Sequence, residues 1–366
     1  MAILEQIAKQ VKQSPLYKQK TVPPVVTSNQ VQHEHDGMAL LMDGMFLPYC
    51  TDLITSYHAG DEDLTMLLLR SGIRAAYSSN SGLFHVSCTG ESGSGKNDLM
   101  AQLAALIPAK NLASYSSISP KALYLATRKV GVGADGKQFN YVDSFSFLNK
   151  IIMVTEIADS KAYDALKAFA ETDEQADFTH ATGSGQMNLE LTVTGPRALW
   201  ITSVTGPKDD QVNRRFVHAR ITKQTQTARM DKLDLMFDNT VGDRHITTDP
   251  RTPLAQAMFR HMFIDNGYGA VKLQSSPETN RKYKRVVHAL GEAGYNTTAV
   301  KQFMTLCECG AFEKRFQRTY IRIEMEDIRE AFYLICAFDR GRVVDEIETG
   351  FGEVLTPKHP LYKEEV

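Results

Sequence analysis

The sequence predicts an α/β fold, in which helices cover a parallel sheet and a smaller helical region follows. Short apolar segments alternate with segments of helical spacing between residues 82 and 204, the pattern of a parallel sheet joined by crossover helices. A glycine-rich segment connects the first apolar run to a helical one, as in folds that bind phosphate at a helix start. From about residue 251 the apolar residues recur at helical spacing throughout.

The elements of the sheet region follow one another in a regular order. Residues 97–107 (NDLMAQLAALI) place Leu99, Leu103 and Leu106 on one helix face, and Pro120 suits the first turn of another helix. Glycines at 131, 133 and 136 and at 183 and 185 are typical of hairpin turns. We expect strands at 82–88, 150–157 and 198–204, helices at 97–107, 120–129 and 160–171, and hairpins at 131–142 and 178–194.

The remaining chain suggests four regions. Residues 2–13 have helical spacing and form an arm that packs on its own domain or joins subunits, and the proline-containing residues 14–36 are typical of a linker. The predicted regions are an N-terminal arm or subdomain at 1–50, an α/β core at 51–248, a helical region at 249–340 and a C-terminal tail at 341–366.

Composition excludes several classes of protein. Of the 366 residues, 43% are hydrophobic and 23% are charged, which is ordinary globular usage and not that of a disordered or fibrous chain. The apolar runs are too short to span a membrane, and the N-terminus is not a signal peptide. Five cysteines are too few for a disulfide scaffold, and we expect Cys307 and Cys309 to be packed thiols. We therefore expect a cytoplasmic protein without a membrane partner, in a bacterial or archaeal cell or a virus-infected host.

The strongest motif is a phosphate-binding loop. Gly90-Glu91-Ser92-Gly93-Ser94-Gly95-Lys96-Asn97 fits G-x-x-x-x-G-K followed by a polar residue, between an apolar strand and a helix. Glycines let backbone N–H groups converge on phosphate oxygens, and the lysine reaches the β- and γ-phosphates. The amide of Asn97 stands where a Ser or Thr usually ligates Mg²⁺. The expected nucleotide-binding residues are Gly90, Glu91, Ser92, Gly93, Ser94, Gly95, Lys96, Asn97 and Asp98.

A second strand ends in a carboxylate that suits hydrolysis. If residues 151–156 lie beside the first strand, Glu156 reaches the γ-phosphate and orients an attacking water. The alternative is a core strand with a solvated glutamate at its end. Thr155 stands where an aspartate usually helps to hold the metal, so Asn97 and Thr155 form a weakened Mg²⁺ site, with water completing the coordination.

Two later segments complete the candidate site. The strand at 198–204 ends in Thr202 and Ser203, where such ATPases place a group that senses the γ-phosphate; Ser203 is favoured over Thr202. Arg214 and Arg215 follow, and an arginine here completes a neighbouring subunit's site. Ordinary strand-end polarity and a surface salt-bridge pair are the respective alternatives.

The order of these motifs resembles an AAA+ ATPase, and more narrowly the minichromosome maintenance helicases and their relatives in phages, plasmids and other mobile elements. The similarity runs from residue 83 to about 338. It implies a three-layer P-loop core with a helical lid, a helix-2 insert before Glu156, and a pre-sensor-1 hairpin at 178–194. It also implies ATP and Mg²⁺ as cofactors, a ring, most often a hexamer, Arg215 as arginine finger and Lys301 as sensor 2.

The resemblance further implies a DNA motor, a replicative helicase or translocase that works with other replication proteins. The hairpin at 178–194 lacks the Lys or Arg that the family often turns toward DNA, which leaves His180, Gln186 and Asn188 as the DNA-facing residues. Weakened metal positions and a hairpin without Lys or Arg favour an alternative, an ATP-switched protein that assembles on DNA or a partner and barely hydrolyses. The basic cluster at 281–285 either touches phosphates or is a solvated helix face; a helix-turn-helix at 281–293 and 296–308 is less favoured.

Overall fold

The fold is described from a computed structural model of the chain. It describes residues 30–77, 82–116, 128–132, 138–142, 145–147, 149–155, 157, 170, 177–184, 187–194, 198–204, 210–221, 226–263, 275–292 and 294–338. Among these residues, no helix is long and apolar enough to cross a membrane.

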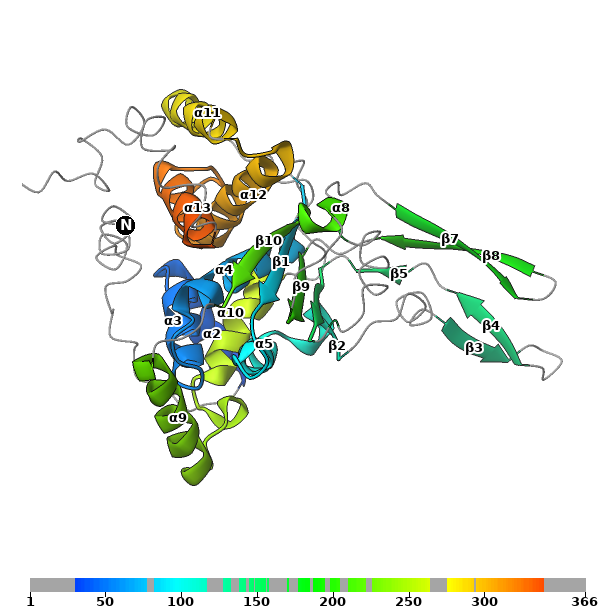
Figure 1. The fold of residues 1–366 in the computed structure, drawn as a ribbon, viewed down its shortest axis with the longest axis horizontal. Coiled ribbons are helices and arrows are strands. Elements are labelled where there is room, and N and C mark those ends of the chain that lie inside the picture. Colours follow the sequence, from blue (N-terminus) through cyan, green and yellow to red (C-terminus); the bar gives the residue numbers. More distant parts are fainter. Residues whose placement is uncertain are drawn as a thin grey trace, which may run out of the picture.

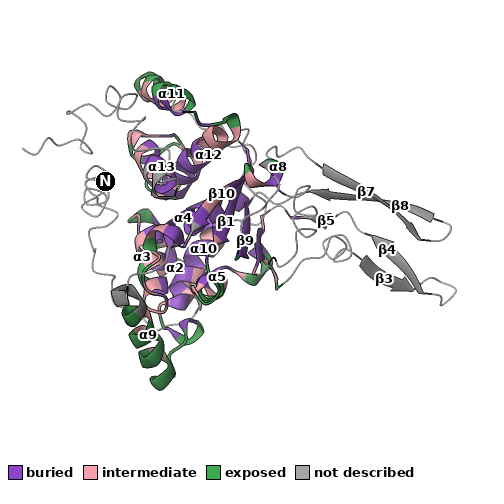
Figure 2. Ribbon diagram, viewed as in Figure 1, coloured by how far each residue is buried: buried purple, intermediate pink, exposed green. Residues whose placement is uncertain are grey.

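A parallel sheet of five strands forms the centre of the molecule (Figure 1). The strands are β1 (Phe84–Thr89), β2 (Leu112–Tyr115), β6 (Ile151–Val154), β9 (Ala198–Ser203) and β10 (Phe216–Arg220), in the order β10-β1-β9-β6-β2. Every neighbouring pair is parallel. The residues of β6 and β9 are buried throughout, because a parallel sheet is covered on both faces (Figure 2). The predicted α/β fold is confirmed. The strand at 151–156 does not lie beside the first strand, as the role of Glu156 assumed, because β9 lies between β1 and β6.

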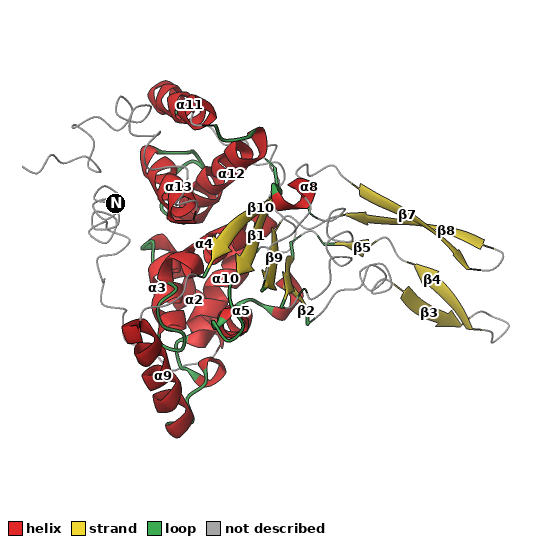
Figure 3. Ribbon diagram, viewed as in Figure 1, coloured by secondary structure: helices red, strands yellow, loops and turns green. Residues whose placement is uncertain are grey.

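Helices from both ends of the chain pack around this sheet (Figure 3). The helix α4 (Glu62–Ile73) lies against β1 and β9, and Gly72 allows the close approach, since a Cβ there would lie 2.9 Å from Trp200. The indole Nε1 of Trp200 donates to the Ser71 hydroxyl at 2.9 Å. The other helices are α2 (Gln30–Met42), α3 (Phe46–Thr55), α5 (Lys96–Leu106), α9 (Gln226–Val241), α10 (Thr252–Met262), α11 (Pro277–Glu292), α12 (Thr297–Glu313) and α13 (Met325–Phe338), with the short α8 (Asp210–Asn213).

Two hairpins project from the same edge of the molecule (Figure 1). One is formed by β3 (Arg128–Val132) and β4 (Gln138–Val142), and the other by β7 (Asp177–Ser184) and β8 (Met187–Thr194). The short strand β5 (Phe145–Ser146) runs parallel to β8. Both hairpins were predicted from their glycines.

A buried ionic cluster joins α4 to the C-terminal helices. The fully buried Arg70 guanidinium binds Glu313 at 2.9 Å and Glu330 at 2.6 Å. Lys314, in the 3-10 turn η4 (Lys314–Phe316), binds Glu330 at 2.9 Å and Asp327 at 3.2 Å. Because each buried charge has a partner, the cluster fixes these helices against the core without leaving an uncompensated charge.

Several sequence predictions need correction. The proposed linker at 14–36 is wrong at its end, because α2 already begins at Gln30 and packs along α10. Residues 128 and 129 belong to β3 instead of a helix, since they pair with Tyr141 and Val142. The predicted helices at 2–13 and 160–171 fall almost entirely outside the described residues, as does most of 120–129. The domain boundaries stay predictions.

Candidate functional site

The glycine-rich loop joins β1 to α5, as the motif predicted. Gly93 and Gly95 have φ angles of 78° and 89°, which glycine adopts without the steric cost that a side chain brings. Gly95 immediately precedes α5 and leaves no room for a side chain, because a Cβ there would lie 2.9 Å from Cε1 of His58. Backbone shape and close packing therefore both require glycine at this point of the loop.

Lys96 is the first residue of α5, directly after the loop, and is only 8% exposed. Its Nζ donates to the carbonyls of Gly90 and Glu91, each at 2.7 Å, and to the Ser94 hydroxyl at 3.1 Å. Burial lowers the pKa of this amine, and none of the described carboxylates pairs with it. A buried cation held only by neutral oxygens fits an anionic ligand, which is what the phosphate-binding motif predicted.

The carboxyl ends of β6 and β9 meet the start of α5. The single proton of the Thr202 hydroxyl has two acceptors within reach, Oδ1 of Asn97 at 2.9 Å and the Thr155 carbonyl. Ser203, by contrast, has a buried hydroxyl that forms no hydrogen bond with the described residues. The structure thus brings Thr202, the less favoured sensor residue, into contact with the loop, and Ser203 as the sensor stays a prediction. Glu156 lies outside the described residues.

The oxygens of Asn97 and Thr155 could bind a magnesium ion, but they supply no charged ligand. Asn97 offers an amide oxygen and the nearby Thr155 a hydroxyl and a carbonyl, which are acceptable but uncharged ligands. The Asn97 oxygen already accepts the Thr202 hydrogen bond. No cluster of three or more His, Cys, Asp or Glu among the described side chains forms a metal site.

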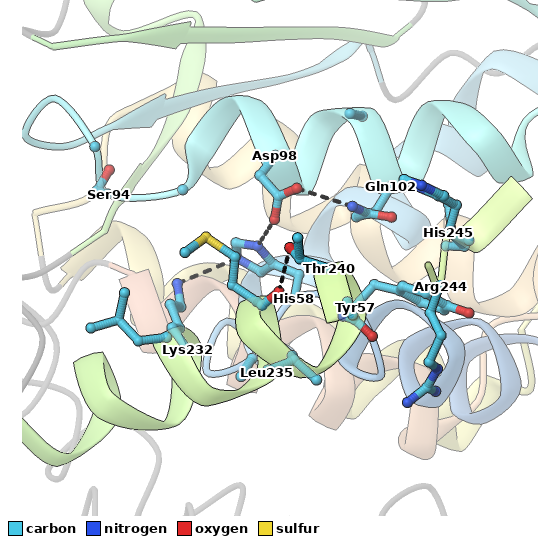
Figure 4. Close-up of a pocket in the computed structure, with 18 of the residues that line it drawn as sticks. Tyr57, His58, Ser94, Asp98, Gln102, Lys232, Leu235, Thr240, Arg244 and His245 are labelled. Atoms are coloured by element: carbon cyan, nitrogen blue, oxygen red, sulfur yellow. Dashed lines mark hydrogen bonds and ion pairs between the residues drawn. The ribbon is translucent and has the colours of Figure 1, made fainter. Parts of the chain in front are cut away.

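A cavity of about 840 Å³ opens beside the loop, between α5 and α9 (Figure 4). One wall is formed by the loop at 91–95 and by side chains of α5, and the opposite wall by α9. The turn before α4 and the segment 244–247 close the ends. Apolar side chains lie among amides, hydroxyls and charged groups; the lining includes Tyr57, Glu91, Asp98, Ala101, Gln102, Ala105, Lys232, Leu233, Leu235, Met236, Asn239, Thr240, Arg244 and Ile246. Such a lining suits a flat organic ring next to a phosphate site.

Four charged side chains tie α9 to the loop. The buried His58 lies between two carboxylates, with Nδ1 at 2.7 Å from Asp98 and Nε2 at 2.7 Å from Asp61. Lys232 of α9 binds the same Asp61 oxygen at 2.7 Å. Burial lowers the pKa of His58, but the hydrogen bonds to Asp61 and Asp98 outweigh burial and raise it overall. The imidazolium form can donate to both carboxylates, and we call this set the His58 cluster.

The other predicted site residues lie elsewhere. Arg215 is half-buried between α8 and β10, and its neighbour Arg214 is exposed. Lys301 lies in α12 and does not line the cavity. His180 and Asn188 lie in β7 and β8, opposite Leu191 and Gly183, and Gln186 falls outside the described residues. Their roles stay predictions.

The basic cluster and the two neighbouring cysteines, Cys307 and Cys309, lie in the C-terminal helices. Arg281, Lys284 and Arg285 are exposed on α11, and the choice between phosphate contact and a solvated face stays open. Cys307 and Cys309 are buried free thiols, as predicted.

Sequence reasoning missed most of the cavity. Of the His58 cluster only Asp98 was predicted, because it directly follows the loop motif. His58, Asp61 and Lys232 come from segments whose positions relative to the loop depend on the tertiary fold. One signal was present: Gln102 follows Asp98 by four positions and so lies on the same face of the predicted helix.

Two comparisons with known proteins agree with this geometry. Residues 31–265 match a family described as the MTBMA_p00010 P-loop domain. The chain is also similar to a protein of Methanothermobacter marburgensis named "Uncharacterized protein MTBMA_p00010", with 21% identity over 282 residues. The similar region covers 76% of this chain and 32% of that relative, so this chain spans about a third of the relative's length.

Proposed function

The chain belongs to the MTBMA_p00010 P-loop domain family, and we propose that it is an ATPase that binds the triphosphate at Gly90–Asn97 and the base in the adjoining cavity. The observation that carries this proposal is Lys96, a buried cation with no carboxylate partner among the described residues, in a glycine loop beside an open cavity. A phosphate chain supplies the missing negative charge, and the cavity is large enough for a nucleoside.

In this proposal each residue of the site has a distinct role. The backbone N–H groups of the loop and Lys96 bind the phosphate oxygens, and the start of α5 adds favourable charge. Glu156 orients the attacking water, and Thr202 or Ser203 senses the γ-phosphate. Asn97 and Thr155 hold Mg²⁺, in part through water; when bound, the ion neutralises charge on the phosphate oxygens.

We further propose that the ATPase is the motor of a ring, most often a hexamer, that moves along or unwinds DNA during replication. The chain's likeness to the minichromosome maintenance helicases supports this assignment, together with a hairpin, β7–β8, that lies between β6 and β9 in sequence and projects from the core. In such a ring Arg215 reaches the neighbouring subunit's nucleotide, and β7–β8 faces DNA through His180, Gln186 and Asn188. Lys301 serves as sensor 2, and replication proteins are the expected partners.

A second candidate is an ATP-switched assembly protein with little hydrolysis. It is favoured by the hydrogen bond from Thr202 to Oδ1 of Asn97, since this oxygen is the one that would ligate Mg²⁺. Slow turnover is expected where Mg²⁺ has only uncharged protein ligands and one of them, the Asn97 oxygen, already accepts a hydrogen bond.

The test is steady-state ATP hydrolysis with and without single-stranded or double-stranded DNA. We expect hydrolysis by the parent protein, none by Lys96→Ala, and parental activity in the control Lys110→Ala, which removes an exposed lysine. Glu156→Gln should retain ATP binding while turnover falls by orders of magnitude. Activity that survives in Lys96→Ala would overturn the assignment of the loop. A parent that binds ATP but turns it over no faster than Glu156→Gln would favour the assembly protein.

Mixed variants test the ring. Arg215→Ala should bind ATP but fail to hydrolyse it, and mixing it with Lys96→Ala should restore activity at interfaces that pair an intact loop with an intact arginine. Arg214→Ala is the control. No rescue, with both variants proven to co-assemble, would show that Arg215 does not act across an interface.

A further inference from the structure

Two amide oxygens in the wall of the cavity have no hydrogen-bond partner in the described part of the chain. Oε1 of Gln102, on α5, and Oδ1 of Asn239, on α9, are both buried and form no hydrogen bond with the described residues. Both side chains line the cavity. Buried acceptors without a donor cost free energy, so their presence in a binding cavity points to a ligand that supplies N–H groups.

The orientation of the Gln102 amide is fixed by its neighbour. Nε2 of Gln102 donates to Oδ1 of Asp98 at 3.0 Å, and Asp98 is held in turn by His58 at 2.7 Å from its other oxygen (Figure 4). An ionised carboxylate only accepts hydrogen bonds, so the amide must turn its NH₂ group toward Asp98. The carbonyl oxygen is then left without a donor on the other side of the amide, buried in the wall of the cavity.

The distance from the loop suits a purine. Gln102 follows Lys96 by six positions of α5, or about 9 Å at the helical rise of ~1.5 Å per residue. A ligand whose phosphates contact Lys96 therefore extends its base alongside Gln102 and toward α9. Leu233, Leu235 and Met236 provide apolar contacts for the ring.

We propose that Gln102, assisted by Asn239, selects adenine nucleotides by accepting hydrogen bonds from the exocyclic amine of the base. The proposal rests on the proposed function, since it assigns the base of the nucleotide bound at the loop. Adenine carries an NH₂ group at C6, whereas hypoxanthine and guanine carry an oxygen there. In those bases a second acceptor would face the Gln102 oxygen, which repels the ligand and leaves both acceptors unpaired.

The His58 cluster has a positioning role in this selection. Asp61 links Lys232 of α9 to His58, and His58 links them to Asp98, the residue that orients Gln102. The contacts of Asp61 with Lys232 and of His58 with Asp61 and Asp98 therefore set the distance between α9 and α5, and this distance is the width available to the base.

The test is isothermal titration calorimetry with ADP and inosine diphosphate, which differ only at C6 and the adjacent ring nitrogen. We expect the parent protein to bind ADP about 10- to 100-fold more tightly, the range for one buried polar group left unpaired. Gln102→Leu should lose most of this preference through weaker ADP binding. The matched control is Gln32→Leu, because Gln32 makes the same type of hydrogen bond, to Asp36 at 2.7 Å, on an exposed part of α2. It should leave both affinities unchanged.

The outcomes separate this inference from the proposed function. Equal affinity for the two nucleotides, with both lost in Lys96→Ala, would overturn base selection by Gln102 and leave the nucleotide site standing. A preference for ADP that Gln102→Leu retains in full would also overturn it. No binding of either nucleotide by the folded parent protein would overturn both proposals.

Discussion

Replacing Gly95 by alanine should damage the loop more than the same change at Gly93. Both glycines have a positive φ, so either alanine incurs about 1–2 kcal/mol for a left-handed backbone. At Gly93 a Cβ meets nothing within 4 Å, whereas at Gly95 it lies 2.9 Å from Cε1 of His58. The imidazole cannot easily move aside, because both of its nitrogens are held by carboxylates at 2.7 Å.

The steric contact should make Gly95→Ala the more destabilising by about 1–3 kcal/mol, the usual cost of overpacking a buried site. The effect of a glycine-to-alanine change on the unfolded chain is similar for the two variants and cancels in the comparison. Urea unfolding of the parent and both variants measures the difference, and ADP titration shows whether the loop still binds.

A double mutant tests the cause. Adding His58→Ala removes the atom that the new Cβ meets, so Gly95→Ala should cost no more than Gly93→Ala in that background. Equal destabilisation by the two alanines in the parent background would refute the reasoning, since it would mean that His58 does not confine Gly95.

Two further predictions concern buried charge. Arg70→Met should lower the free energy of unfolding by roughly 3–5 kcal/mol, because Glu313 loses its buried partner and Glu330 keeps only Lys314. Arg322→Met, which removes an exposed pair with Glu324, should cost less than about 1 kcal/mol in the same urea titration. The raised pKa of His58 means that its contribution to stability is complete below its ordinary pKa of about 6.5 and is lost as the pH rises through the folded-state value. The stability advantage of the parent over His58→Gln should therefore shrink as the pH rises above about 6.5, and an advantage that grows with pH would contradict the cluster's assigned charges.

The sheet and its loop could be predicted because their signals are local. The runs at 82–88, 150–157 and 198–204 are apolar and short, and each became a central strand. The motif at 90–97 fixes both a chain reversal and a helix start, so its position followed directly from the spacing of Gly90, Gly95 and Lys96.

Two parts of the structure have no local sequence signal: the helices that precede the sheet, and the helix α9 that forms one wall of the cavity. The helix α4 is buried on nearly every side, so its sequence lacks the polar face that marks an amphipathic helix. The helix α9 exposes Met230, Leu233 and Phe237, so its apolar residues do not mark a core-facing side. The cavity is formed where α9 meets α5, a contact between segments more than 100 residues apart, which pattern reasoning along the chain does not reach.

The most direct test of the account is an experimental structure of the chain with a non-hydrolysable ATP analogue. We predict that Lys96 exchanges its hydrogen bonds to the Gly90 and Glu91 carbonyls for contacts with phosphate oxygens, and that the adenine ring lies between α5 and α9 with its amine at Gln102. An analogue bound away from the 90–97 loop, with Lys96 still hydrogen-bonded to those carbonyls, would contradict the claim that this loop is the nucleotide site.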